Sequence, residues 1–261
     1  MVQGWSGKYR CPVRLSVAPI VANSVLPAHR TPLGIETRDQ IVLRGELATP
    51  TWCDPVATLV CVHPLTIEGG SMESHVLRKL AWRLPALAGL AVLRFNMRGA
   101  GTGAMRSEGE FDSAQGEGLD LGAVLARVTQ LGLPEPWLVG WSFGTDVVLK
   151  FGARSPVAGA VLLSPPLRFA EAADLSRWAA TDLPLVAVVP EHDDYLKPEP
   201  ARAAFATIPQ AKVVAVQGAG HLWVGERYVQ EVLNQIVRVV APVAYPLPRE
   251  WNGPMTRWSD L

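Results

Sequence analysis

The stretch "LVGWSFGTD", Leu138 to Asp146, places one serine between two glycines in the spacing G-x-S-x-G. A chain of this length contains that spacing by chance with a probability on the order of 10%, given average glycine and serine contents. The flanking residues are therefore needed to interpret it. An apolar run at 136–140 predicts a strand, and the apolar residues at 147–151 have helical spacing. A strand, a sharp turn and a helix are the setting that exposes a nucleophilic hydroxyl, so Ser142 is a candidate nucleophile.

The composition indicates a globular protein with a sizeable core, since 49% of the 261 residues are hydrophobic, 18% are charged and the net charge is zero. Because lysine and arginine do not cluster, we expect no nucleic-acid partner. No apolar run approaches the roughly 18 residues of a membrane span, so we expect no membrane partner. The three cysteines, Cys11, Cys53 and Cys61, form no C-x-x-C pair, which favours reduced thiols and a cytoplasmic location.

Residues 1–34 predict an extended N-terminal arm, because they contain several prolines and no clear period. Lys8, Arg10 and Arg14 precede an apolar stretch at 15–26, a pattern that loosely resembles a secretory signal. A proline and two polar residues interrupt that stretch, so we do not interpret it as an export signal.

Strand-like and helix-like patterns alternate from residue 35 onward, and a polar break at 38–40 predicts a hairpin over 35–47. Further short apolar runs lie at 57–62, 90–95, 136–140, 158–163, 184–189 and 211–216. Amphipathic stripes, which predict helices, lie at 76–84, 121–131 and 229–240. Continuous apolar runs suit strands buried on both faces, so the pattern predicts an α/β domain at 35–240 with a mostly parallel central sheet flanked by helices.

Two connecting segments bear on the size of this domain. The segment at 164–183 has room for one short helix, which predicts little or no cap domain. The tail at 241–261 has several prolines and no period, which predicts coil.

A serine hydroxyl needs a base, and the chain contains five histidines. They are His29, His63, His75, His192 and His221. Enzymes with this type of serine turn have the chain order serine, acid, histidine, which leaves His192 and His221. His221 follows the apolar run at 211–216 directly, and loops at the carboxyl ends of parallel strands open onto the crevice where sites form. We therefore expect His221 to be the base.

The acid is expected after the run at 184–189, where the sequence reads "VVPEHDDYLKP". Asp193 is the expected acid, and Asp194 is the alternative. No H-E-x-x-H or paired Cys/His spacing accompanies this acidic segment, so we expect no metal site.

Several longer motifs accompany the serine turn. They are "VHPLTIEGGSMESHVL" from Val62, "RFNMRGAGTG" from Arg94, "SEGEFDSAQGEGLDL" from Ser107 and "GAGHLW" from Gly218. In this order, and together with the serine turn, they resemble small bacterial members of the α/β-hydrolase superfamily, over roughly residues 35–240. The resemblance implies the α/β-hydrolase fold and a serine hydrolase without cofactor or metal, with Ser142 as nucleophile, Asp193 as acid and His221 as base.

The same resemblance implies an oxyanion hole made of two backbone N–H groups. One donor is the residue after the nucleophile, Phe143. The other comes from the loop after His63, and because Pro64 has no N–H, Leu65 is the expected donor. We expect His63 to brace this loop rather than to transfer protons.

The glycine-rich run "GAGTGA", Gly99 to Ala104, has an alternative interpretation. It fits the dinucleotide fingerprint G-x-G-x-x-A, and Asp120 lies about 20 residues further on. That fingerprint must open a helix directly, whereas here a polar segment intervenes before the helical period resumes. We therefore expect a loop beside the active site.

The expected substrate is a small-molecule ester with a small or medium acyl group. Trp141, Trp223, Leu222 and Phe169 are candidates for an apolar acyl pocket. The same three catalytic residues also fit a thioesterase or a peptidase or amidase, and the fold also occurs in binding proteins without catalytic activity. The sequence makes no prediction of oligomeric state.

Overall fold

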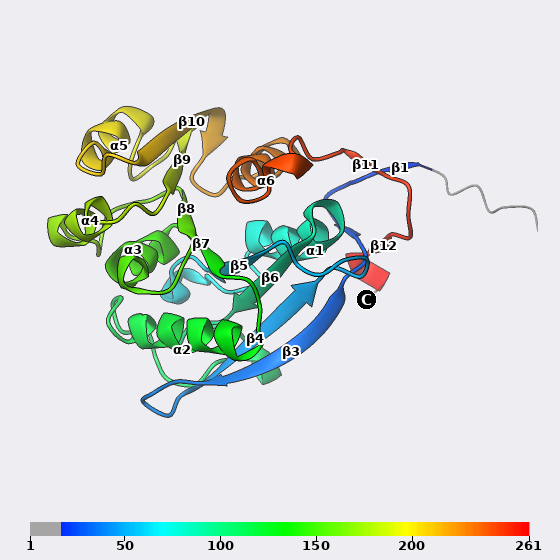
Figure 1. The fold of residues 1–261 in the computed structure, drawn as a ribbon, viewed down its shortest axis with the longest axis horizontal. Helices are drawn as coiled ribbons and strands as arrows, with labels where there is room; N and C mark the ends of the chain where they lie inside the picture. The colour runs from blue at the N-terminus through cyan, green and yellow to red at the C-terminus, as the bar shows by residue number, and fades with distance from the viewer. Residues whose placement is uncertain (1–16, 261) are drawn as a thin grey trace, which may run out of the picture.

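The computed structural model describes residues 17–260 (Figure 1). The segment with Lys8, Arg10, Cys11 and Arg14 lies outside the described residues, and so do the first two residues of the apolar stretch at 15–26. The helices are α1 (His75–Ala88), α2 (Gly116–Gln130), α3 (Phe143–Phe151), α4 (Ala172–Ala179), α5 (Pro198–Phe205) and α6 (Glu226–Val240).

One central sheet of eight strands organises the molecule. The strands are β3 (His29–Glu36), β4 (Val42–Thr49), β5 (Ala57–Val62), β6 (Leu90–Phe95), β7 (Pro136–Trp141), β8 (Gly159–Leu163), β9 (Leu185–His192) and β10 (Ala211–Gly220). Their order is β10-β9-β8-β7-β5-β6-β4-β3. The β3–β4 hairpin and the β4–β6 pair are antiparallel, and the other pairs are parallel. The predicted α/β class with a mostly parallel sheet is confirmed, and each predicted apolar run lies within a strand apart from at most one residue at its start.

Helices cover both faces of this sheet (Figure 1). Every residue of β5 and β6 is buried, because both faces of these central strands are covered. On one face the apolar stripes of α1 and α6 pack onto the sheet, and on the other face α2, α3, α4 and α5 do so. The sheet therefore separates two apolar cores.

The parallel strands bring the loops at their carboxyl ends to one edge of the sheet. His63 follows β5, Ser142 follows β7, Asp193 follows β9 and His221 follows β10. The connection from β8 to β9 contains the single helix α4, so the described chain has no large cap domain over this edge. In α/β proteins, ligand-binding and catalytic sites form at this carboxyl edge of the sheet.

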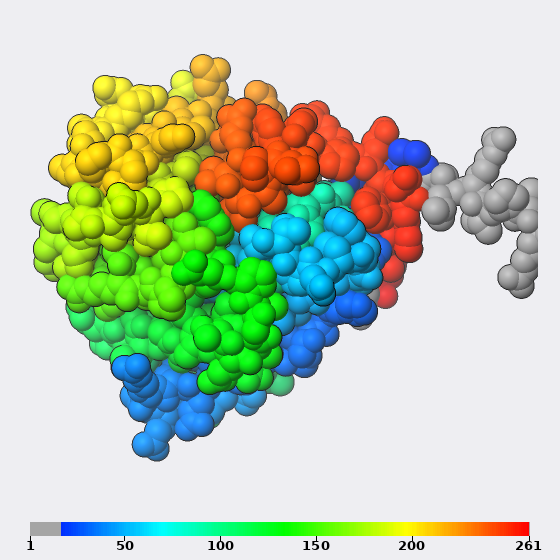
Figure 2. Space-filling model, in the orientation of Figure 1, coloured from blue at the N-terminus to red at the C-terminus, as the bar shows by residue number. Residues whose placement is uncertain are grey.

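The C-terminal tail, expected to be coil, contains two strands of two residues each that pair with the N-terminal arm. Strand β11 (Glu250–Trp251) is antiparallel to β1 (Ala18–Pro19), and β12 (Thr256–Arg257) is antiparallel to β2 (Ser24–Val25). Figure 2 shows the red C-terminal segment packed against the blue start of the described chain. Two segments without long strands thus form backbone hydrogen bonds with each other.

The boundary of the arm also differs from the expected residue 34. Strand β3 begins at His29, so the end of the expected arm is already part of the central sheet. No helix among residues 17–260 is long and apolar enough to cross a lipid bilayer.

Candidate active site

Ser142 lies in a sharp turn between β7 and α3. Its backbone adopts φ 52° and ψ −122°, a combination that persists only where the surrounding structure holds it. Two glycines permit the turn. A Cβ atom at Gly144 would lie 2.1 Å from the Val62 carbonyl oxygen, and one at Gly140 would lie 2.7 Å from the Gly144 carbonyl oxygen. The motif therefore has glycine where neighbouring backbone leaves no room for a side chain.

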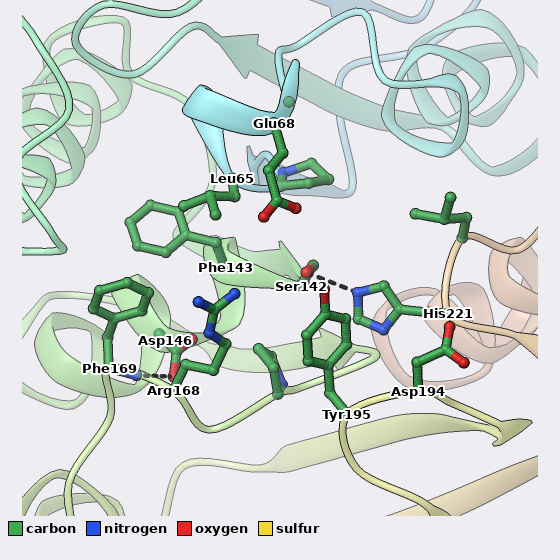
Figure 3. Close-up of a pocket in the computed structure, with 14 residues that line it drawn as sticks. Leu65, Glu68, Ser142, Phe143, Asp146, Arg168, Phe169, Asp194, Tyr195 and His221 are labelled. Atoms are coloured by element: carbon green, nitrogen blue, oxygen red, sulfur yellow. Dashed lines mark hydrogen bonds between the residues drawn. The ribbon is translucent and has the colours of Figure 1, made fainter.

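The structure brings His221 and Asp193 together with Ser142. Nε2 of His221 lies 2.9 Å from Oγ of Ser142 (Figure 3). On the other side of the ring, Nδ1 of His221 lies 2.9 Å from Oδ2 of Asp193. An ionised carboxylate only accepts hydrogen bonds, so Nδ1 donates to Asp193 and Nε2 is left to accept from the serine hydroxyl.

Asp193 is held on its other side by backbone donors. Its side chain is buried, and its Oδ1 accepts hydrogen bonds from the N–H groups of Tyr195 at 2.9 Å and Leu196 at 3.1 Å. Burial raises the pKa of this carboxyl, but the hydrogen bonds from His221 and the two N–H groups outweigh it and hold the pKa below its ordinary value. Asp194, the alternative acid, is exposed and lies on the cavity wall instead.

The backbone of His221 is fixed by two donors from the sheet. Its carbonyl oxygen accepts from Nε1 of Trp141 at 3.3 Å and from Oγ of Ser164 at 3.0 Å. Trp141 is buried and its ring packs edge-on against His75, with 5.3 Å between centroids. Trp141 therefore does not line the acyl pocket as expected, because its indole faces the core and anchors the histidine loop.

Trp223 also lies elsewhere than in the acyl pocket where it was expected. It follows His221 by two residues, in a turn where its N–H donates to the Gly220 carbonyl at 3.0 Å. This turn directs Leu222 outward, where it is 57% exposed and lines the cavity, and directs Trp223 inward, where it is fully buried among core residues of the α1 and α6 face. Trp223 is thus a core residue and not part of the acyl pocket.

The cavity beside Ser142 has a volume of about 220 Å³. Phe169 and Leu222 line it as expected, and so do the two residues expected to supply oxyanion donors, Leu65 and Phe143. The rings of Phe143 and Phe169 meet edge to face with 5.2 Å between centroids. These contacts give one wall of the cavity an apolar surface.

Sequence reasoning missed four polar or aromatic side chains of the same cavity. They are Glu68, Asp146, Arg168 and Tyr195. The ring of Tyr195 lies 4.6 Å from that of His221. Of the four, only Asp146 had a signal in the sequence, since a residue four positions after Ser142 shares its face of the helix.

The loop after β5 is braced by His63, which is completely buried. The Met97 N–H donates to its Nε2 at 3.0 Å, and its Nδ1 lies 2.6 Å from the Pro64 carbonyl oxygen. Nε2 therefore accepts and Nδ1 donates, which defines a neutral ring. Burial lowers the pKa of His63 to about 4, with the hydrogen bond to Pro64 acting in the opposite direction, so the ring is neutral near pH 7.

Two residues of the "RFNMRG" motif hold the far end of this loop. The Asn96 side-chain oxygen accepts from the Met72 N–H at 2.8 Å, and the Arg94 guanidinium donates to the Met72 carbonyl oxygen at 2.8 Å. Arg94 also pairs with Glu46 at 2.7 Å and Glu73 at 3.2 Å. The motif thus attaches the loop to the end of β6.

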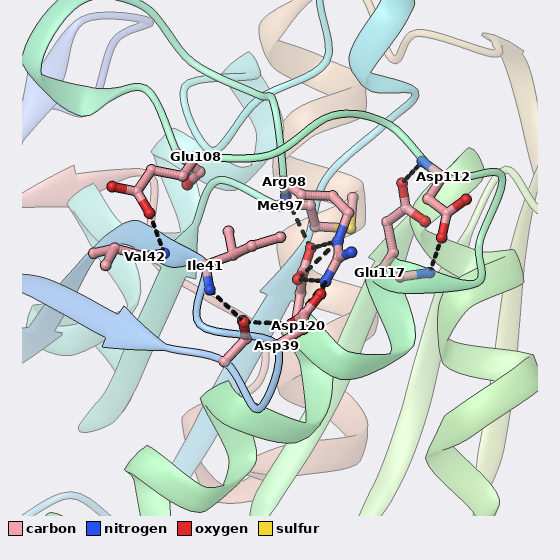
Figure 4. Close-up of polar contacts among 12 residues, drawn as sticks. Asp39, Ile41, Val42, Met97, Arg98, Glu108, Asp112, Glu117 and Asp120 are labelled. Carbon is pink, nitrogen blue, oxygen red and sulfur yellow. Dashed lines mark hydrogen bonds and ion pairs between the residues drawn. The ribbon is translucent and has the colours of Figure 1, made fainter.

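The contacts of Arg98, in the same motif, give Asp120 a structural role in place of the dinucleotide-binding role considered for it (Figure 4). Asp120 on α2 accepts from the Arg98 Nη2 at 2.8 Å and from its backbone N–H at 2.8 Å, and Asp39 of the hairpin lies 3.1 Å from the same guanidinium. The glycine-rich run ends in a short 3-10 helix at 103–105 and does not open a long helix. Asp120 therefore anchors a loop.

No group of three or more His, Cys, Asp or Glu side chains that could hold a metal ion occurs among residues 17–260.

Comparisons with known proteins agree with this architecture. No family model matches the chain. An uncharacterized protein of Rickettsia prowazekii is 32% identical over 133 residues, a match that covers 50% of this chain and 53% of that protein. The chain thus matches about half the length of this curated relative.

Two solved structures are similar over most of their length. An α/β serine hydrolase homologue from Coxiella burnetii has a TM-score of 0.68 and 27% identity, and the match covers 80% of this chain and 96% of that one. A serine hydrolase without a lid from Xanthomonas campestris has a TM-score of 0.67 and 26% identity, covering 84% and 98%. The chain therefore has the fold of the α/β serine hydrolases.

The Arg98 network yields a prediction about stability. Asp120→Ala leaves the guanidinium of Arg98 buried with only Asp39 as a partner, and uncompensated buried charge destabilises strongly. We expect the free energy of unfolding to fall by about 3 kcal/mol. Denaturant unfolding at pH 7 measures it, with the exposed Asp54→Ala as the matched control. Equal stability of the two variants would contradict the role given to Asp120.

Asp146 yields a prediction about pH. Burial raises the pKa of this carboxyl to about 6, although N–H donors of Ala170 and Phe169 act in the opposite direction. The folded state therefore binds this proton more tightly than the unfolded chain, so ionisation of Asp146 costs stability as pH rises from about 4 to about 6. Asp146→Asn cannot ionise. Its stability relative to the native chain should rise by about 2 kcal/mol between pH 4 and pH 7.

Chemical denaturation at pH 4, 5, 6 and 7 measures this difference, with Asp54→Asn as the control at an exposed position. A difference between Asp146→Asn and the native chain that stays constant across this range would refute the prediction.

Proposed function

We propose that this protein is a serine hydrolase that cleaves carboxylic esters with small or medium acyl groups. The observation that carries the proposal is the continuous hydrogen-bonded chain from Asp193 through His221 to Ser142, with 2.9 Å at each step. This arrangement can remove a proton from an alcohol at neutral pH and return it to a leaving group.

The proposed reaction has two steps. Oγ of Ser142 attacks the ester carbonyl carbon while its proton passes to Nε2 of His221, and Asp193 stabilises the imidazolium that forms. The bond to the alcohol oxygen then breaks, and His221 gives the proton to that oxygen. A water molecule attacks the acyl-enzyme in the same way, loses a proton to His221, and releases the acid as Ser142 recovers its hydrogen.

The developing oxyanion would be bound by the N–H groups of Phe143 and Leu65. Phe143 is the first residue of α3, and the first N–H groups of a helix have no partner within it. The Leu65 N–H belongs to the peptide whose carbonyl, that of Pro64, accepts from His63. In a trans peptide the N–H and the C=O point in opposite directions, so His63 fixes the direction of the proposed donor.

The small cavity, and the single short helix α4 between β8 and β9 in the described residues, support a small acyl group in an open site. A volume of about 220 Å³ lies below the range of about 300–1,000 Å³ that is usual for drug-sized ligands. The apolar rings of Phe143 and Phe169 would contact the acyl chain. The same residues can attack thioesters and activated amides, so matched p-nitrophenyl esters, thioesters and anilides decide the preferred bond.

Replacing Ser142 with alanine should lower kcat/KM for p-nitrophenyl esters by about 10⁴-fold or more, because the nucleophile is lost. His221→Ala should have an effect of similar size. Both variants should lose labelling by a fluorophosphonate, while Ser176→Ala, on the exposed side of α4, should be labelled normally. Ester hydrolysis retained in a folded Ser142→Ala protein would refute the nucleophile.

The brace formed by His63 gives a further prediction. His63→Ala should lower kcat by about 10- to 100-fold with little change in KM, because the Leu65 donor acts on the transition state more than on the bound ester. The exposed His192→Ala is the control. Steady-state kinetics with a thermal unfolding measurement separates lost positioning from lost folding, and an effect confined to KM would contradict this role.

A further inference from the structure

Arg168 extends from the loop after β8 into the wall of the proposed catalytic cavity (Figure 3). Two aromatic rings flank its guanidinium, whose Cζ lies 5.9 Å from the Phe169 centroid and 5.8 Å from the Tyr195 centroid. Contacts of this kind hold a guanidinium in place while its N–H donors remain available. Arg168 is thus a cation positioned near the proposed nucleophile.

The loop that carries Arg168 is held in a strained conformation. Leu167 has φ 52°, in the left-handed region that non-glycine residues rarely occupy. The buried Asp146, one helical turn after Ser142, accepts from the N–H groups of Phe169 at 3.2 Å and Ala170 at 3.0 Å. Such strain persists only where other contacts enforce it, and here it directs Arg168 toward the cavity.

The exposed guanidinium of Arg168 forms no ion pair within the described part of the chain, although its charge acts on the Asp146 carboxylate and lowers the pKa of that group. Among residues 17–260 no carboxylate lies within 4.0 Å of it, whereas the buried Arg94 and Arg98 each pair with two acids. The planar fork of an arginine matches a carboxylate and can donate two parallel hydrogen bonds to it. A free fork beside the proposed nucleophile therefore fits a substrate carboxylate.

The direction of proton transfer decides which end of the ester meets Arg168. His221 must protonate the leaving alcohol, so the alcohol lies on the His221 side of Ser142. In Figure 3, Phe143, Phe169 and Arg168 lie on the other side of Ser142 from His221. The acyl group would therefore extend toward Arg168.

We propose that Arg168 binds a carboxylate at the end of the acyl group, so that the site prefers half-esters of short dicarboxylic acids. This inference rests on the proposed ester hydrolase function and adds the substrate class. The cavity of about 220 Å³ limits the acyl group to a short chain.

Three acids also lie in the cavity wall and shape this preference. Asp146 directs one oxygen to the backbone donors beneath Arg168, and Asp194 lies on the His221 side, where the alcohol would leave. Glu68 faces the cavity from the wall opposite Arg168. Its charge would repel a substrate carboxylate, so Glu68 and Arg168 should act on selectivity in opposite directions.

The test compares mono-p-nitrophenyl glutarate with p-nitrophenyl pentanoate, which match in chain length and differ in the terminal carboxylate. The measured quantity is the ratio of their kcat/KM values, with Ser142→Ala protein as the blank for spontaneous hydrolysis. The native chain should favour the glutarate. Arg168→Gln should reduce the ratio about tenfold, since one charge-assisted contact is lost. Arg168→Lys should reduce it less, and Glu68→Gln should raise it.

Arg154→Gln, an exposed arginine outside the cavity, should leave the ratio unchanged. A native ratio near one, or an equal ratio in the native and Arg168→Gln proteins, would overturn the proposal. Hydrolysis of the pentanoate that depends on Ser142 distinguishes this failure from failure of the proposed function. A binding measurement with monomethyl glutarate on Ser142→Ala supplies an independent readout, because binding should be lost when Arg168→Gln is added.

Discussion

The close approach of the serine turn to strand β5 is the constraint on which the whole site depends. Gly144 lies so near the Val62 carbonyl that a single added carbon would be 2.1 Å from it. This contact sets the start of α3 directly against the loop that follows β5. It therefore brings the Phe143 and Leu65 backbones to one cavity from positions almost 80 residues apart in the chain. A larger residue at this position would separate the proposed nucleophile from the loop as well as strain the turn.

Sequence patterns predicted the parts of the structure that local spacing determines. The strand runs, the turn at Ser142 and the loop with His221 follow from short-range patterns that tertiary packing did not override. The roles of Trp141 and Trp223 depend on which way a side chain leaves a turn, and apolar character does not encode this direction. The pairing of the tail with the arm depends on contacts between distant segments, so it left no periodic signal. Arg168 enters the cavity through the strained Leu167 backbone, which no spacing rule predicts.

The motifs outside the catalytic residues support the site from a distance. Arg94 and Asn96 hold Met72 by its carbonyl and its N–H, while the backbone of Met97 fixes the ring of His63. Side chains on a strand alternate between faces, and the backbone continues to offer donors where the strand ends. One segment can therefore brace both ends of the loop after β5. These residues are charged or polar and buried, which makes them resemble catalytic residues in a sequence even though they touch only protein.

A site without a large cap cannot select its substrate by enclosing it, so the walls of the cavity must supply the selection. Apolar contact discriminates weakly, because one methylene contributes only about 1–3 kcal/mol. The exposed guanidinium of Arg168 can discriminate further, because only a substrate that carries a carboxylate can accept charge-assisted hydrogen bonds from it. Holding Arg168 in place requires the strained Leu167 and the buried Asp146, both of which oppose stability. Such costs are typical of residues that serve function, and a stable core alone would not require them.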